Sequence, residues 1–508
     1  VKRKTIYRFF TAMAVGVLSS FSSCSDEYSD AFYVDNNTYY DEPFRPMLHF
    51  TPEKFWMNDP NGMVYLDGEY HLFYQHNTQA SKWGPMNWGH AVSTDLLHWE
   101  HLPVALSPDK NGDIFSGSAV IDKNNTAGFG ANAMVAVFTS NGDRQRQSIA
   151  YSTDKGRTFT MYENNPVLKN DDIVDFRDPK VFWYADGNYW VMSLATGQTI
   201  TFYSSPDLKS WTRLSEFGEG IGAHGGVWEC PDLFPLTYNG QQKWVLLVSI
   251  NPGGPGGGSA TQYFTGDFDG TAFTADASPY PLWVDYGKDN YAGVTWNNVP
   301  ETDGRSLFIG WMSNWQYAEA VPTLSWRSGA TLPRELSLKN HPEGYPVLAS
   351  QVIKEIESIS GGWSDAARNN NTYQLISESA PYQVDITLDM PADGICMLSL
   401  ENEQGESYKL TVNSRDGRLI ADRTGSGQTA FSPDFGCVLE SPLNASGSLK
   451  ISLYVDYMSV ETLVNDGISQ QTNLVFPQTI YNRLVVNADS RIQPSSVKVR
   501  TMQPVWQY

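Results

Sequence analysis

The stretch Trp56-Met57-Asn58-Asp59-Pro60-Asn61-Gly62 places one carboxylate, that of Asp59, on a backbone that cannot continue as a smooth helix or strand. Pro60 removes an amide donor and fixes its own φ, and Asn61-Gly62 is a strong signal for a hairpin turn. The stretch therefore predicts that Asp59 lies where a strand ends and the chain turns. An ordinary surface turn has the same signature, so the rest of the chain must decide between the two interpretations.

Two short patterns recur around this stretch, from about residue 44 to residue 338. One is a hairpin turn between aromatic runs, as in Tyr65-Leu66-Asp67-Gly68, and the other is Ser/Thr-x-Asp before an aromatic residue, as in Ser93-Thr94-Asp95 before Trp99. The copies lie roughly 50–60 residues apart without helical periodicity between them, which is typical of a β-propeller. We predict an all-β fold in which residues 44–340 form a five-bladed β-propeller, although a β-sandwich or β-helix is an alternative. The expected blades cover about residues 55–105, 112–165, 175–218, 228–278 and 290–338.

The pattern changes after residue 338. Residues 341–362 contain Gly361-Gly362 and are expected to be a linker. Short alternating strands follow, for example at 383–388 and 449–455, and they predict a second all-β domain at 363–508, most simply a β-sandwich. This domain carries no group of residues typical of a catalytic site.

The N-terminal residues have the features of an export signal. Four basic residues precede an apolar run at 9–18 that is too short to span a bilayer. Small residues end at Cys24, and the stretch resembles a lipoprotein signal, although Phe21 stands where such signals usually have Leu. We expect a lipoprotein signal peptide at 1–24, lipidation of Cys24, and an acidic, flexible tether at 25–43. A plain signal peptide without lipidation is the alternative. Both interpretations predict export. The lipidated form would be anchored to the bacterial cell envelope, at the outer membrane and cell surface.

Composition excludes several other classes. The 508 residues carry a net charge of −21 with no basic stripe, so nucleic acid is not expected as a partner, and the lipid anchor is the only membrane contact expected. Three further cysteines, Cys230, Cys396 and Cys437, are too few for a disulfide scaffold, although Cys396 and Cys437 could pair. No cysteine or histidine cluster has metal-binding spacing, and we expect no metal and no other cofactor.

Two more carboxylates occupy the position that Asp59 has in its blade. Asp178 lies in Phe176-Arg177-Asp178-Pro179 and Glu229 in Trp228-Glu229-Cys230-Pro231, each immediately before an apolar strand. The first strand of every propeller blade lines a central funnel, so the three acids are expected to converge. Taken singly, Arg177-Asp178 could be a local ion pair and Glu229 a solvated loop residue. Three acids at one blade position are harder to explain in that way.

This trio suits hydrolysis of a glycosidic bond. The reaction needs two carboxyl groups, one protonated to assist the leaving oxygen and one ionised to attack or to activate water. The apolar neighbours of Glu229 favour the protonated form, whereas the amide donors near Asp59 favour the ionised form. Arg177 is expected to keep Asp178 charged, so that it can hold sugar hydroxyls.

The three motifs WMNDPNG (56–62), RDP (177–179) and EC (229–230) resemble glycoside hydrolase family 32, the invertases, inulinases and levanases. The order and spacing of the motifs match that family, and the resemblance covers essentially all of 44–338. Other similar segments are Phe73-Tyr74-Gln75, Trp83-Gly84, Phe115-Ser116-Gly117-Ser118, Asn251-Pro252-Gly253-Gly254 and Leu332-Pro333-Arg334-Glu335-Leu336.

The resemblance implies an enzyme that cleaves β-fructofuranosides with retention of configuration. Asp59 would be the nucleophile that forms a fructosyl-enzyme, Glu229 the general acid and then base, and Asp178 a stabiliser of the transition state. Retention implies carboxyl groups of Asp59 and Glu229 about 5–5.5 Å apart. The residues implied to line the fructose pocket are Asn58, Gln75, Trp83, Phe115, Ser116 and Arg177.

The sequence leaves the substrate open among levan, inulin and sucrose, and the cleavage mode open between exo and endo. A lipid-anchored enzyme would meet long polymers, which slightly favours a fructan, levan first. The retained Asn58-Asp59 pair mildly disfavours an endo-inulinase. A sucrose-cleaving invertase, a fructosyltransferase, an inverting arabinan-cleaving propeller and a non-catalytic surface glycan-binding protein are the alternatives.

Overall fold

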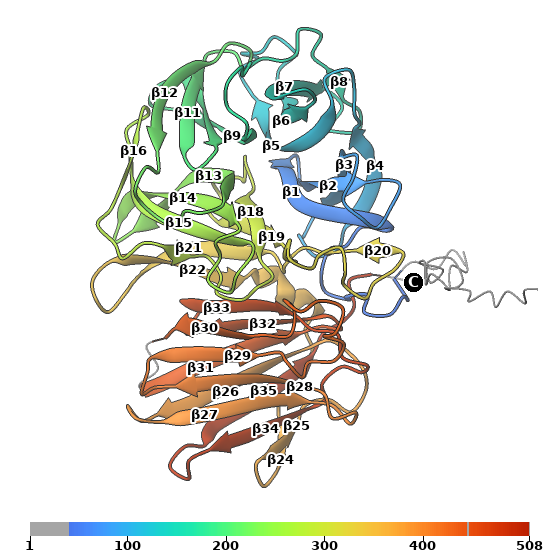
Figure 1. Ribbon diagram of the computed structural model, residues 1–508, viewed down its shortest axis with the longest axis vertical. Helices are drawn as coiled ribbons and strands as arrows, with labels where there is room; N and C mark the ends of the chain where they lie inside the picture. Colours follow the sequence, from blue (N-terminus) through green and yellow to red (C-terminus); the bar gives the residue numbers. More distant parts are fainter. Residues whose placement is uncertain (1–39, 444–446, 507–508) are drawn as a thin grey trace, which may run out of the picture. The chain divides into compact units, whose positions relative to one another are not determined.

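The computed structural model describes residues 40–443 and 447–506, and their regular structure is almost entirely β. Strands β1 to β22 form five sheets, and β23 to β35 form two more (Figure 1). One short 3₁₀ helix, Lys354–Ile359, separates these two groups, and no helix of the described residues is long and apolar enough to cross a bilayer. The predicted signal peptide and Cys24 lie outside the described residues.

Five innermost strands form a ring, and they confirm the prediction of a five-bladed propeller. Each contacts its neighbours around the ring, from β1 through β5, β9, β13 and β18 back to β1. They are β1 (Phe55–Leu66), β5 (Asp113–Asp122), β9 (Phe176–Tyr184), β13 (Val227–Tyr238) and β18 (Tyr291–Thr295).

Antiparallel strands continue each sheet outward from the ring. The first sheet adds β2 (Glu69–Asn77), β3 (Asn87–Ser93) and β4 (Glu100–Leu106), and the second adds β6 (Ala133–Asn141), β7 (Gln145–Ser152) and β8 (Thr160–Met161). The third adds β10 (Tyr189–Thr196), β11 (Ile200–Ser205) and β12 (Thr212–Phe217), and the fourth adds β14 (Gln241–Asn251), β15 (Ala260–Phe268), β16 (Phe273–Ala275) and β17 (Leu282–Trp283). The fifth contains β19 (Ser306–Trp311), β21 (Arg334–Asn340) and β22 (Pro346–Val352), while β20 (Trp326–Arg327) pairs in parallel with β1 and closes the ring.

The structure moves two of the expected domain boundaries. Strand β22 pairs with β21, so the fifth sheet extends to Val352, into the stretch 341–362 that was expected to be a linker. At the other end, Tyr40 is buried and stacks on Trp506 with 4.2 Å between ring centroids. Within the last residues of the predicted tether, Tyr40 is therefore packed, and Glu42 accepts hydrogen bonds from Arg45.

The predicted turn at Asn61-Gly62 is wrong, because β1 runs through it from Phe55 to Leu66. Two register shifts, between Met57 and Pro60 and between Asn61 and Val64, absorb the proline and the glycine within the strand. Gly62 has a φ of +55°, and a Cβ there would lie 2.6 Å from the ring of Phe73. The motif thus makes a bulged inner strand instead of a hairpin.

The same irregularity recurs in all five innermost strands, near their N-terminal ends. A bulge bends a strand and redirects side chains, and positive φ values at Asp178 (65°), Cys230 (45°) and Ala292 (53°) accompany three of these bulges. The register shifts lie between Met57 and Pro60, Ile114 and Gly117, Arg177 and Lys180, Glu229 and Asp232, and Tyr291 and Val294.

The C-terminal part is the predicted β-sandwich. Its apolar core packs between a six-stranded and a seven-stranded sheet and includes Tyr382, Leu398 and Ile451. Cys396 and Cys437 are both free thiols, so the pairing left open by the sequence is not formed. The strands are β23 (Ser364–Asp365), β24 (Ala367–Asn369), β25 (Thr372–Gln374), β26 (Tyr382–Met390), β27 (Ile395–Glu401), β28 (Ser407–Asn413), β29 (Arg418–Asp422), β30 (Val438–Pro442), β31 (Gly447–Val455), β32 (Ser459–Val464), β33 (Ser469–Leu474), β34 (Arg483–Ala488) and β35 (Pro494–Thr501).

Buried charges join the sandwich to the segment that precedes β1. His49 contacts Asp456 through Nδ1 (2.8 Å) and Glu461 through Nε2 (2.7 Å), and all three side chains are fully buried. Burial opposes the charged imidazole, but the two carboxylates outweigh it and raise the pKa of His49 to about 9. Arg334 forms an ion pair with Oε2 of Glu461, whereas His49 contacts Oε1 of the same carboxylate.

We expect His49→Gln to destabilise the protein by about 3–5 kcal/mol at pH 6, because it leaves buried carboxylates without their partner. A pKa raised from 6.5 to about 9 contributes stability that is fully present below pH 6.5 and is lost as the pH rises through about 9. Thermal unfolding from pH 6 to pH 9.5 should therefore show a variant deficit that shrinks with pH. The exposed pair His98–Asp95 supplies the control His98→Gln, and an equal deficit at all pH values would contradict the assignment.

Candidate active site

The structure brings Asp59, Asp178 and Glu229 together from β1, β9 and β13. Cys230 connects the group: its thiol lies 3.6 Å from Oδ2 of Asp59 and 3.6 Å from Oδ2 of Asp178, and its backbone N–H donates to the same Asp178 oxygen at 3.0 Å. Glu229 is the residue before Cys230 in β13. Three strands that are far apart in sequence thus place three carboxyl groups at one end of the ring.

Asp59 accepts a hydrogen bond on each oxygen. Asn58 Nδ2 donates to Oδ1 (3.1 Å) and Ser116 Oγ to Oδ2 (2.7 Å). Trp56 fixes the Asn58 amide by donating from Nε1 to Oδ1 (2.7 Å), and Trp56 itself stacks on Trp315. Burial raises the pKa of Asp59, the Ser116 hydrogen bond opposes this, and the charge of Glu229 adds to it. Of the amide donors expected from the sequence, Asn58 reaches Asp59, but burial outweighs the hydrogen bonds and the pKa of Asp59 is raised rather than lowered.

The surroundings of Glu229 differ from the expected apolar setting, and that prediction is wrong. Arg177 donates to Oε1 from Nε (3.1 Å) and Nη2 (2.9 Å), and the hydroxyl of Tyr291 donates to Oε2. The bulge in β9 turns Arg177 toward Glu229, and its Nε lies 4.0 Å from Asp178. Both oxygens of Glu229 therefore accept hydrogen bonds from protein donors.

Asp178 does not have the low pKa that a paired arginine was expected to give. Its side chain is almost fully buried, and burial raises its pKa; Arg177 opposes the rise, while the charges of Glu229 and Asp59 reinforce it. The resulting pKa is about 7. Burial, reinforced by two neighbouring carboxylates, thus outweighs the effect of one guanidinium at 4.0 Å on the pKa of Asp178.

The other residues implied for the fructose pocket lie around these acids. Gln75 is nearly buried and donates from Nε2 to the carbonyl of Ile114 (3.0 Å), one residue before Phe115. Trp83 is 45% exposed and meets the Phe115 ring edge-on at 6.2 Å between centroids. Phe115 and Ser116 lie in the bulge of β5, and Ser116 reaches Asp59 directly. Trp83 therefore offers an open aromatic surface beside a floor of polar groups.

Tyr291 is a site residue that the sequence reasoning missed. It is the first residue of β18, where the fifth blade contributes to the ring, and its hydroxyl donates to Glu229. Burial and then the charge of Glu229 raise the pKa of Tyr291 well above its usual value, so the hydroxyl keeps its proton. Its position at the start of the innermost strand of a blade could have identified Tyr291, because Asp59, Asp178 and Glu229 lie near the starts of their strands.

We expect Tyr291→Phe to lower kcat about 10- to 100-fold with little effect on KM, because a hydrogen bond to a charged group contributes about 1.5–3 kcal/mol. The Phe ring keeps the packing of the buried side chain against Trp311. Steady-state kinetics on a fructoside would measure the loss.

A matched control for this variant is Tyr263→Phe. Tyr263 is a buried tyrosine whose hydroxyl accepts a hydrogen bond from the backbone of Leu348 (3.1 Å), away from the three acids. The Tyr263→Phe variant should be less stable than the wild-type protein, with unchanged kcat and KM. Equal kinetic losses in the two variants would refute a role for the Tyr291 hydroxyl in the reaction.

Within residues 40–443 and 447–506 no group of three or more His, Cys, Asp and Glu side chains is arranged to hold a metal ion. The side chains that meet at the site offer carboxyl groups, a phenol, a guanidinium and a thiol. Two carboxyl groups with different hydrogen-bond partners on one pocket floor suit glycosidic bond cleavage.

Comparison with known families agrees with this geometry. Residues 49–348 match the glycosyl hydrolases family 32 N-terminal domain, and residues 354–502 match the glycosyl hydrolases family 32 C terminal. The chain belongs to glycoside hydrolase family 32. The resemblance seen in the three motifs is thus confirmed at the level of the family, and this family 32 protein is a glycoside hydrolase.

Relatives of this family 32 protein include a levanase of Bacillus subtilis (strain 168), 47% identical over 94% of this chain and 73% of the relative. An extracellular exo-inulinase of Aspergillus ficuum is 38% identical over 92% of this chain and 96% of the relative. Among solved structures, an exo-inulinase of Aspergillus awamori superimposes with a TM-score of 0.85 at 35% identity, covering 92% of this chain and 100% of the other. A β-fructofuranosidase of Schwanniomyces occidentalis complexed with fructosyl-erythritol gives 0.83 at 34% identity, covering 92% and 99%.

Proposed function

We propose that this family 32 protein hydrolyses the β-fructofuranosidic bonds of fructans, with levan as its preferred polymer and retention of configuration at the anomeric carbon. The observation that carries the proposal is the meeting of Asp59, Asp178 and Glu229 from three strands of the ring: the Cys230 thiol contacts Asp59 and Asp178, its amide donates to Asp178, and Glu229 precedes it in β13. The 47% identity to a levanase over most of the chain supports levan, and the relatives named exo-inulinases support release of terminal fructose.

In the first step Asp59 attacks the anomeric carbon of the fructosyl unit, and a carboxylate–carbon bond forms as the glycosidic bond breaks. Glu229 donates its proton to the departing oxygen. In the second step Glu229 takes a proton from water, the water oxygen bonds to the anomeric carbon, and the bond to Asp59 breaks. The two inversions give net retention, and one water is consumed for each bond cleaved.

The hydrogen bonds of Glu229 set a condition on the first step. A protonated carboxyl has one O–H to donate and keeps acceptor capacity on both oxygens, and both oxygens of Glu229 already accept from protein donors. The O–H must therefore point away from these donors, and a shift of Arg177 or Tyr291 would turn it toward the leaving oxygen. Arg177 is the better candidate, because it also binds Asp175 (2.6 Å) and can turn toward sugar hydroxyls together with Asp178.

A time course of products from levan and from inulin, run side by side, tests the proposal. Fructose as the sole early product, released faster from levan, is the expected result, and proton NMR in the first minutes should show the β anomer. A ladder of oligosaccharides would replace exo by endo action, and early α anomer would refute retention. Hydrolysis of sucrose alone would make the protein an invertase, and transfer products at high sucrose would make it a fructosyltransferase.

We further propose that the protein is exported and lipidated at Cys24, on the strength of the basic, apolar and small residues that precede it. Metabolic labelling with an alkyne fatty acid should mark the protein in the membrane fraction. The Cys24→Ser variant should lose the label and appear in the soluble fraction. A label that survives this change would place the modification elsewhere.

A further inference from the structure

A second cavity lies at the opposite ends of the innermost strands. It has a volume of about 290 Å³ and is lined by the last residues of β5, by Phe182 and Trp183 of β9, by Trp190 of β10 and by Asn297 and Asn298 after β18. Trp183 is three residues beyond Lys180, where the bulge of β9 ends, about 10 Å further along the strand, and none of the three acids lines the cavity. The cavity is therefore distinct from the pocket that holds the acids.

A layer of buried polar contacts closes the ring between the two sites. Lys180 donates from Nζ to Asp232 (3.0 Å), and Ser118 donates to the carbonyl of Pro179 (2.9 Å). The amide of Asn297 donates to the carbonyls of Ala119 (2.8 Å) and Val181 (3.0 Å), which ties β5 to β9. A sugar chain cannot pass through this layer, so an occupant of the second cavity must enter from the far side of the ring.

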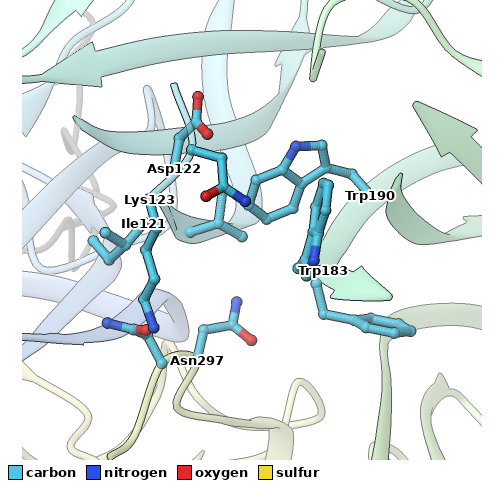
Figure 2. Close-up of a pocket in the computed structure, with 10 residues that line it drawn as sticks. Ile121, Asp122, Lys123, Trp183, Trp190 and Asn297 are labelled. Carbon is cyan, nitrogen blue, oxygen red and sulfur yellow. The ribbon is translucent and has the colours of Figure 1, made fainter. Parts of the chain in front are cut away.

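Aromatic surface forms one wall of the cavity. Figure 2 shows Trp183 and Trp190 on one side, with Ile121, Asp122 and Lys123 facing them and Asn297 below. The two indoles meet nearly at right angles, 72° with centroids 5.0 Å apart, and such an edge-to-face contact fixes Trp183 without covering both of its faces. Trp190 is anchored by donation from Nε1 to Thr126 (2.9 Å).

The polar groups of the cavity suit a neutral ligand with many hydroxyls. The Asp122 carboxylate already accepts hydrogen bonds on both oxygens, from Thr126 and from the backbone of Ala127. The amide nitrogens of Asn297 and Asn298 are bound to backbone carbonyls, which leaves their amide oxygens as acceptors. Lys123 is exposed and can donate at the rim. Acceptors, a donor and a flat aromatic face together match the hydroxyls and the apolar face of a sugar ring.

We propose that this cavity is a second, non-catalytic carbohydrate site that binds one or two fructosyl units of the polymer. Its volume is near the lower end of ligand pockets, which fits a short stretch of sugar rather than a larger ligand. The identity of the sugar rests on the proposed fructan hydrolysis. Because the site and the active site lie on one rigid propeller, binding here raises the local concentration of polymer ends at the acids.

Kinetics of the full chain with Trp183→Ala test this site. The KM for levan should rise about tenfold, since loss of one aromatic contact of about 1.5 kcal/mol corresponds to that factor. The kcat on levan and all constants on sucrose should stay unchanged, because sucrose gains nothing from a second site. Trp363→Ala is the matched control, since Trp363 is a 40% exposed tryptophan of the sandwich.

Lys123→Ala keeps the test decisive if Trp183→Ala lowers the melting temperature, because Lys123 is exposed and its loss leaves the core intact. It should raise the KM for levan about threefold, as expected for one lost hydrogen bond. An unchanged KM for levan in both variants would overturn the second site, as would equal losses on levan and sucrose. A wild-type protein that cleaves neither levan nor inulin would instead refute the proposed function.

Discussion

Asp59→Asn is expected to lower kcat on levan and on sucrose by about 10⁴- to 10⁶-fold, because an amide cannot form the fructosyl-enzyme bond. The change preserves the size of the side chain, and Ser116 can still donate to the remaining oxygen. The melting temperature should not fall, since burial raises the pKa of Asp59 and the neutral amide removes a charge that the fold disfavours. Single-turnover kinetics with enzyme in excess over substrate, corrected for background hydrolysis, would measure the loss.

The matched control is Asp186→Asn, which alters an exposed aspartate in the turn at the other end of β9. It should keep full activity. Residual turnover above about one per cent in Asp59→Asn, with no deamidated protein detectable by mass spectrometry, would remove Asp59 from the role of nucleophile.

Much of the propeller could be predicted because each blade repeats a local signal. Turn residues and the Ser/Thr-x-Asp pattern predict that the blades begin at about residues 55, 112, 175, 228 and 290. In the structure the innermost strands begin at residues 55, 113, 176, 227 and 291. The closing strand β20 and the outer strand β22 were missed. β20 has two residues and is defined by its pairing with β1, so no local pattern marks it.

The acids were predictable as a set, but their partners were not. Motif and blade position both pointed to Asp59, Asp178 and Glu229, whereas the bulges decide where neighbouring side chains point. The sequence pairs Arg177 with Asp178, its neighbour, yet at the bulge of β9 the guanidinium donates to Glu229 and keeps a longer contact of 4.0 Å with Asp178. The bulge, which the sequence does not specify, thus accompanies a choice of hydrogen-bond partner that the order of the residues did not indicate.

Glu229→Gln is the second change with a large expected effect, and it separates the two steps of the reaction. Glutamine cannot donate a proton to the leaving oxygen, so kcat on levan and sucrose should fall about 10²- to 10⁴-fold. β-Fructosyl fluoride has a leaving group that needs no proton, so the first step should survive. The second step needs Glu229 as base, so the fructosyl-enzyme should accumulate and appear in the mass of the intact protein and of the peptide that contains Asp59.

The accumulation is what distinguishes acid–base catalysis from a merely structural role for Glu229. Arg177 and Tyr291 can still donate to the side-chain oxygen of a glutamine, but the amide nitrogen cannot accept from the other donor, so some loss of order in the site is expected as well. Such disorder would slow both substrates alike. Equal losses on levan and on the fluoride, with no trapped intermediate, would therefore contradict the assignment, whereas a burst on the fluoride followed by stalled turnover would establish Glu229 as the residue that protonates the leaving group and then activates water.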